Sequence, residues 1–197
     1  TDYFIKCTPS GSTFYYQVGN GNYDHQQWVT SVKMATLGTS AGGQPRPVGK
    51  NPNDASMASF CGATLALMSR MYRHWDAAYA DNCLAHAKYA YTYAKAHPGT
   101  AGTMEGGFYN AEPAWKDNYI CLCTELYLAT GDQAYKTEAL SYASDIKDGN
   151  WVLDYQNGED LALFNLARLG NTTSEGILQS IVNRYVAAAQ SNGVIKV

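Results

Sequence analysis

The chain has 197 residues, which is enough for one domain with a sizeable core and short for two ordinary domains. Hydrophobic residues make up 46% and charged residues 16% of the chain, and the formal net charge is −3. With this near balance and no cluster of Lys and Arg, the composition argues against a nucleic-acid or anionic-membrane partner. No apolar run approaches 18 residues, which argues against a membrane-spanning helix.

Tyrosine is the compositional outlier, with 16 Tyr and four Trp against five Phe. Tyr and Trp combine a flat apolar face with a hydrogen-bonding tip, which suits helix packing and also suits sugars. For any single Tyr, packing is the favoured interpretation. The five cysteines cannot all pair. Cys61 and Cys83 offer one disulfide, but buried free thiols are favoured.

The first quarter of the chain predicts little regular structure. Residues 2–6 resemble the end of a helix, and residues 24–37 are partly helical at most. Long loops are expected over residues 7–23 and 38–53, the second of which holds four Gly and three Pro without periodicity. Loops of this length are usually functional or mobile.

Helices dominate the rest of the chain, because apolar residues recur at spacings of three and four. Asn53 or Asp54 can cap the first of them, and Asp76 and Asp132 can cap two later ones. Tyr79 and Tyr135 each follow such an Asp by three residues and should face back toward the preceding helix. The expected helices cover about 54–75, 76–97, 112–130, 133–147, 158–169 and 173–191, with a third long loop over 99–111.

This pattern predicts an all-α fold of about six to eight helices in antiparallel pairs. Tight turns lie at one end and long loops at the other, which is typical of an α/α barrel or a helical solenoid. The long loops should form the functional face.

The segment from Tyr16 to Trp28 is the richest in chemistry, since it holds two Gly with small polar residues between them. If Asp24 starts a helical turn, His25 and Trp28 lie three apart on one side. A hydrogen-bonding imidazole beside a flat indole would make a sugar subsite. A capping Asp, a satisfied His and a core Trp explain the same residues equally well.

Two further loops carry aromatic residues. Phe108 and Tyr109 follow two glycines, and Tyr155 lies among carboxylates ahead of a predicted helix. A hydrophobic staple explains the first group as well as a ligand site does, and capping explains the carboxylates around Tyr155. The sequence contains no GxSxG, HExxH or phosphate-binding glycine loop.

Several motifs, taken in order, resemble glycoside hydrolase family 9, a family of cellulases with an (α/α)6 barrel. They are Asp2-Tyr3-Phe4-Ile5-Lys6, Tyr16-Gln17-Val18-Gly19-Asn20-Gly21 with Asp24-His25 and Trp28, Phe108-Tyr109-Asn110, and Leu128-Ala129-Thr130-Gly131-Asp132.

The resemblance implies the hydrolysis of β-1,4-glucosidic bonds with inversion, and a secreted, extracellular or periplasmic location. It implies that His25 and Trp28 line the substrate cleft and that Phe108 and Tyr109 contribute glucose subsites. Tyr155 takes the place of a stacking Trp. The implied partner is a β-glucan or cello-oligosaccharide.

The resemblance also implies a structural calcium site, but this sequence departs from it. Asp117 and Asn118 are the side-chain ligands that remain, and Pro113 and Ala114 replace small or polar residues. Hard cations take six or more oxygen ligands. No cofactor is therefore required by this interpretation.

No catalytic residue is assigned. By the resemblance, an Asp pair should precede Asp2 and a catalytic Glu should follow Val197. Asp24, Glu105, Glu112 and Asp117 match no catalytic position.

Residues 1–197 are accordingly interpreted as a single incomplete catalytic-domain segment, inactive alone. Its start at Thr1, with neither an initiator Met nor a signal peptide, fits that expectation. The remainder of the domain, or a second copy, would be a partner. A non-catalytic helical carbohydrate-binding module and a structural interaction module are the alternatives.

Overall fold

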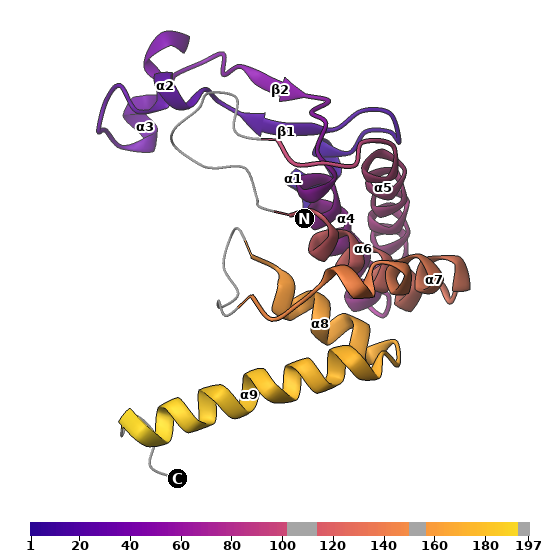
Figure 1. Cartoon of the computed structure of the whole chain (residues 1–197). Helices are drawn as coiled ribbons and strands as arrows, with labels where there is room; N and C mark the ends of the chain where they lie inside the picture. The colour runs from indigo at the N-terminus through magenta and orange to yellow at the C-terminus, as the bar shows by residue number, and fades with distance from the viewer. Residues whose placement is uncertain (102–113, 150–156, 193–197) are drawn as a thin grey trace.

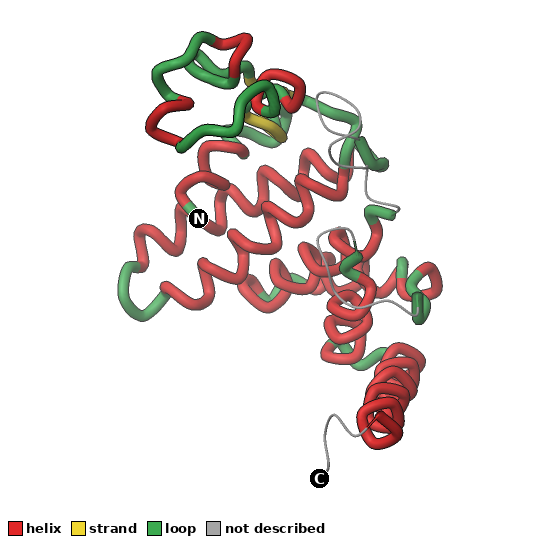
Figure 2. The backbone as a smooth tube through the Cα atoms, turned by 90° about the vertical axis from the view of Figure 1, so that its left-hand side faces the viewer, coloured by secondary structure: helices red, strands yellow, loops and turns green. Residues whose placement is uncertain are grey.

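The structure is a computed structural model that describes residues 1–101, 114–149 and 157–192. Its described part is mainly helical, and its longer helices form three consecutive antiparallel pairs (Figures 1 and 2). This confirms the predicted all-α fold with paired helices. The pairs are α4 (Ala55–Tyr72) with α5 (Ala77–Ala96), α6 (Lys116–Thr130) with α7 (Gln133–Ser141), and α8 (Glu159–Arg168) with α9 (Thr172–Asn192).

Aspartate side chains begin three of these helices, as predicted. Asp54 accepts from the Met57 N–H of α4 at 2.6 Å, and Asp76 accepts from the Tyr79 N–H of α5 at 2.9 Å. Asp132 does the same for α7. These carboxylates satisfy N–H groups that have no partner within the helix, which stabilises the helix start.

Helices α4, α6 and α8 form one layer, because α6 contacts both of the other two. Glu125 of α6 ties this layer together through ion pairs with Arg70 of α4 and Arg168 of α8. Helices α5, α7 and α9 each pack on the layer helix that precedes them. An inner layer with one outer helix per inner helix is the arrangement of part of an α/α barrel.

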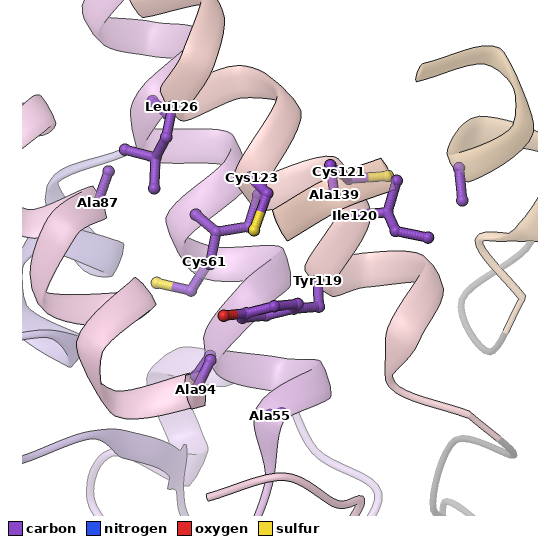
Figure 3. Close-up of a cluster of buried hydrophobic side chains, with 14 of the residues drawn as sticks. Ala55, Cys61, Ala87, Ala94, Tyr119, Ile120, Cys121, Cys123, Leu126 and Ala139 are labelled. Carbon is purple, nitrogen blue, oxygen red and sulfur yellow. The ribbon is translucent and has the colours of Figure 1, made fainter. Parts of the chain in front are cut away.

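Helix α4 approaches its neighbours closely because it carries small residues. Ala55, Ala58 and Ala66 are fully buried. A Cβ atom on Gly62 would lie 2.7 Å from the Cβ of Ala90 on α5 and 2.8 Å from Cδ1 of Leu122 on α6. Side chains of α4, α5 and α6 fill the space between the helices (Figure 3).

Much of the tyrosine excess belongs to this core. Tyr119 of α6 is buried and donates to Oε1 of Glu138 on α7 at 2.8 Å. Tyr91 and Lys95 of α5 donate to the other Glu138 oxygen at 2.9 and 2.6 Å. Glu138 therefore joins three helices through one carboxylate. Packing explains these tyrosines, as was favoured for any single Tyr.

The predicted long loops over residues 7–23 and 38–53 contain more structure than expected. After α1 (Asp2–Cys7), strand β1 (Tyr15–Val18) pairs antiparallel with β2 (Val48–Lys50), and Val18 lies opposite Val48. Between them lie the short helices α2 (Gly21–Asp24), α3 (Ser31–Met34) and the 3₁₀ turn η1 (Thr39–Ala41). The two strands are about thirty residues apart in the chain, so no local hairpin pattern predicted their pairing.

One detail of the helical part also differs from prediction. Helix α7 ends at Ser141, and not near residue 147, and the 3₁₀ turn η2 (Ala143–Asp145) follows it. The ring of Tyr142, between the two, packs edge-on against Trp115 and Tyr119 at 5.6 and 5.7 Å. Tyr79 faces back to the preceding helix as predicted, and Tyr135 packs on Tyr91 of α5 at 5.0 Å.

The cysteine prediction is confirmed, since all five cysteines are free and buried. The thiols fill small spaces in the core, as expected for cysteines that pack as hydrophobic residues.

The close approach at Gly62 predicts an unusual response to alanine. Gly62→Ala should lower the free energy of unfolding by about 1–3 kcal/mol, because the added methyl overpacks the contact with Ala90 and Leu122. Gly176→Ala is the matched control, because nothing lies within 4 Å of that position on α9. It should stabilise the chain by about 0.5–1 kcal/mol. Urea unfolding measures both, and stabilisation by Gly62→Ala would contradict the packing described.

The Glu138 network predicts a pH dependence. Burial alone would raise the pKa of Glu138, but hydrogen bonds from Lys95, Tyr119 and Tyr91 outweigh it, and the pKa is lowered. The ionised Glu138 carboxylate therefore stabilises the folded chain above its unfolded pKa of about 4.3, and this contribution is lost as the pH falls through its lower, folded-state pKa. Glu138→Gln should cost about 1–2 kcal/mol at pH 7 and much less near pH 3. Exposed Glu175→Gln is the control, and a cost independent of pH would rule out this role for the carboxylate.

Candidate functional site

The candidate site lies at the end of the helical array that carries the long connections. The excursion, defined here as residues 8–54, leaves α1 and returns to α4 at this end (Figure 1). Its base is fixed to α5. Phe14 is buried against Tyr93 with ring centres 5.6 Å apart, its N–H donates to Asn51 at 3.0 Å, and Tyr93 donates to the Pro52 carbonyl at 2.7 Å.

His25 follows α2 directly and is exposed. Its Nδ1 lies 2.7 Å from the Gly21 carbonyl oxygen. The expected helical turn beginning at Asp24 is wrong, because Asp24 ends α2. The side chain of Asn20 accepts from the Tyr23 N–H at 3.1 Å and so starts the helix four residues earlier.

Trp28 is fully exposed, with a relative accessibility of 104%, so the interpretation as a core Trp is wrong. Val29 and Val32 beside it are also exposed. An open hollow is lined by Trp28, Val29, Thr30 and Lys33. The excursion therefore presents an indole face and neighbouring apolar groups to solvent, next to a cation.

An ion pair between Arg46 and Asp24 crosses the excursion. Two glycines with positive φ pack against it. Gly19 has φ +102°, and a Cβ there would lie 2.5 Å from Oδ2 of Asp24 and would also meet Arg46. Gly42 has φ +83°, and its Cβ would lie 3.1 Å from the Cα of Asp24. Side chains at either glycine would separate these segments.

Arg46 did not stand out in the sequence. Residues 38–53 carry no periodicity, and the partner of Arg46 lies 22 positions away. Three other predicted residues, Phe108, Tyr109 and Tyr155, lie outside the described residues, as do Glu105 and Glu112.

A cavity of about 300 Å³ lies at the same end, between α1, β1, α4 and the starts of α6 and α8. Its lining is mainly aromatic and apolar. Tyr15 and Tyr16 belong to it, and their place just ahead of the glycine-rich segment was the available sequence signal. The lining residues are Tyr3, Phe4, Cys7, Phe14, Tyr15, Tyr16, Met57, Phe60, Cys61, Asn118, Asn157, Gly158 and Leu161.

Asp117 and Asn118 are brought together at the start of α6, where both are buried. Oδ2 of Asp117 accepts from the Gly158 N–H at 2.9 Å, and Asn118 donates to Oγ of Ser56 at 2.8 Å. Oδ1 of Asp117 is buried without a hydrogen-bond partner among the described residues. Burial raises the pKa of Asp117, although backbone N–H donors oppose the shift.

These two residues do not by themselves fit a calcium ion. They supply one carboxylate and one amide oxygen near Gly158, whereas calcium takes six to eight oxygens. Within the described ranges, no group of three or more His, Cys, Asp or Glu side chains could hold a metal.

Three of the described acidic residues near the site, Asp54, Asp117 and Asp24, have structural roles. Asp54 is 1% exposed and accepts from the backbone N–H groups of Met57 and Ala101 at 2.6 and 2.5 Å. Burial raises its pKa. Asp117 is buried, and Asp24 is paired with Arg46. None of the three is placed as a proton-transfer residue.

The fold and the residues on its long connections together indicate a class of protein. The chain is part of an α/α barrel whose long connections present an exposed indole, an imidazole and tyrosines at one end. Within the described ranges, every helix is too short or too polar to cross a membrane.

Comparison with known families gives the same answer. The family model described as "Glycosyl hydrolase family 9" matches residues 1–196. The chain belongs to this family.

The chain is similar to Endoglucanase A of Fibrobacter succinogenes, with 37% identity over 149 residues, 74% of this chain and 32% of the relative. It is 29% identical to Endoglucanase 14 of Arabidopsis thaliana over 98% of this chain and 40% of the relative. The chain thus spans 32% to 40% of the length of these two relatives.

Solved structures agree with the fold. The cellulase Cel9M of C. cellulolyticum matches 92% of this chain and 42% of its own chain, with a TM-score of 0.80 and 31% identity. Endoglucanase CelQ from Clostridium thermocellum, solved with cellotetraose, matches 90% of this chain with a TM-score of 0.71 and 25% identity.

Proposed function

We propose that this chain is the glucan-binding part of a β-1,4-glucanase of the endoglucanase type. The observation that carries the proposal is the fully exposed Trp28, three residues after His25 on an excursion whose base is fixed to α5. The relatives named as endoglucanases and cellulases support it, as do neighbours solved with cellobiose and cellotetraose.

Binding follows from the chemistry of these side chains. A β-linked glucose unit has apolar faces and a hydroxyl-rich edge. The indole of Trp28 offers a flat face for stacking, and the imidazole of His25 offers hydrogen bonds to hydroxyls. Tyr3, Tyr15 and Tyr16, which line the cavity between α1, β1 and α4, combine the same two properties. The proposal extends this surface to Phe108, Tyr109 and Tyr155.

Catalysis is proposed to need residues outside Thr1–Val197, so the chain alone should bind without hydrolysis. In the complete domain, one carboxylate would activate a water molecule and another would protonate the leaving oxygen, which gives inversion at the anomeric carbon. An extracellular or periplasmic location is part of this proposal, because polymeric glucan is found there.

The remainder of the barrel is the proposed partner of the exposed face of the inner layer. Phe60 and Met71 of α4 are 57% and 54% exposed, and Phe164 of α8 is 50% exposed. Large apolar side chains gathered on one layer usually mark a contact surface. The missing inner helices of the domain would cover them, and a second copy would do so in their absence.

The Trp28 assignment predicts a selective loss of binding. Trp28→Ala should weaken cellotetraose binding about tenfold, the ~1.4 kcal/mol expected for losing one stacking platform. Isothermal titration calorimetry of the 197-residue chain measures this. Trp75→Ala is the matched control, because Trp75 is also exposed, at 78%, but lies at the turn between α4 and α5. Weaker binding in Trp75→Ala and unchanged binding in Trp28→Ala would contradict the proposed site.

We further propose that neither binding nor folding requires a metal. Removal of divalent cations with EDTA should leave the melting temperature within about 1 °C and the cellotetraose affinity unchanged, since a metal-free site gains nothing by mass action. Thermal unfolding with EDTA and with added calcium tests this. A calcium-dependent rise in melting temperature that Asp117→Asn abolishes would show a structural calcium site.

A further inference from the structure

Arg46 connects two parts of the excursion that are distant in the chain. It is the residue between Pro45 and Pro47, just ahead of β2, and its side chain reaches back to Asp24, the last residue of α2. The ladder of β1 and β2 ends beside it, where the Gly19 N–H donates to the Pro47 carbonyl at 2.8 Å. The ion pair therefore joins the end of α2 to the start of β2.

The residues around this ion pair leave room for it. Gly19 and Gly42, both with positive φ, leave no side chain between Asp24 and its neighbours. The side chains of Arg46 and Asp24 are 33% and 28% exposed, so the pair is partly withdrawn from water. Nε of Arg46 is buried without a hydrogen-bond partner in the described part of the chain. A fully exposed ion pair contributes little to stability, but this partly buried pair joins two segments that are 22 residues apart in the chain.

The restricted segment carries the proposed binding residues. His25 is the residue after Asp24, and Trp28 lies three residues further along a stretch outside any helix or strand. The direction of the chain after Asp24 sets where the imidazole and the indole lie. A binding surface made of exposed side chains on a loop depends on such support, because ordering the loop on binding costs free energy.

We propose that Arg46 is a positioning residue for glucan binding, which acts through its ion pair with Asp24 to hold the segment that carries His25 and Trp28. The inference rests on the proposed function of that segment. Arg46 itself is not proposed to contact the sugar.

Arg46→Met removes the pair and keeps an unbranched side chain that replaces the aliphatic part of arginine. It should weaken cellotetraose binding about tenfold by calorimetry, with the free energy of unfolding nearly unchanged because the base of the excursion and the helices are untouched. Lys50→Met is the matched control, since Lys50 is an exposed cation on β2 of the same excursion. It should leave binding unchanged. Arg46→Lys, which keeps the charge, should recover part of the affinity.

A double-mutant cycle separates positioning from direct contact. Asp24→Asn should weaken binding about as much as Arg46→Met, and the double variant should bind no worse than either single variant, because both act through one interaction. Additive losses would overturn the inference, since Arg46 would then act on the sugar by itself.

A measurement without ligand separates this inference from the proposed function. Backbone ¹⁵N order parameters of residues 24–28 should fall from about 0.85 toward 0.6 or below in Arg46→Met, while those of α4 and α5 stay unchanged. Unchanged order in residues 24–28 would overturn the positioning role. Failure of the unmodified chain to bind cellotetraose, together with loss of order in Arg46→Met, would instead overturn the glucan assignment.

Discussion

The close approach of α4 to α5 and α6 at Gly62 is the contact on which the rest of the structure depends. No side chain separates α4 from Ala90 and Leu122 at this point, so α4 packs closely against both α5 and α6. In an interior packed this closely, a shift of one helix must shift its neighbours, so the positions of the helices depend on one another. The inner layer is then extended to α8 through Glu125 and Arg168.

Helix α4 also anchors the long connections that carry the candidate site. Asp54 caps α4 and also accepts from the Ala101 N–H, while the Ala55 N–H donates to the Gly99 carbonyl at 2.8 Å. The end of the excursion and the connection after α5 are therefore both held at the first turn of α4. A rigid array with loops that begin at defined points is the usual way in which a helical barrel supports a binding surface.

The features that were predicted from the sequence are those that depend on residues close together in the chain. The caps at Asp54, Asp76 and Asp132 and the helix pairs follow from local patterns that the structure obeys. The pairing of β1 with β2 and the ion pair of Arg46 join distant residues, and no local periodicity encodes them.

The candidate site divides in the same way. The glycine-rich segment predicted His25 and Trp28 as candidate site residues, and the structure shows both exposed on the excursion. The predicted turn geometry was wrong because Asn20 starts α2 early. Tyr3 and Phe60 reach the cavity only through packing of α1 on α4, so their place there depends on tertiary contacts. The tyrosine excess by itself was compatible with both packing and sugar binding and did not indicate which tyrosines line the cavity.

We propose above that this chain supplies the substrate surface of an inverting β-1,4-glucanase. The most direct test follows the anomeric proton of the first-formed product by NMR, when a longer form of the protein, extended on both sides of Thr1–Val197, cleaves a soluble β-glucan. We expect the α-anomer to appear first and to equilibrate later by mutarotation. A β-anomer formed first, which means retention, would contradict it.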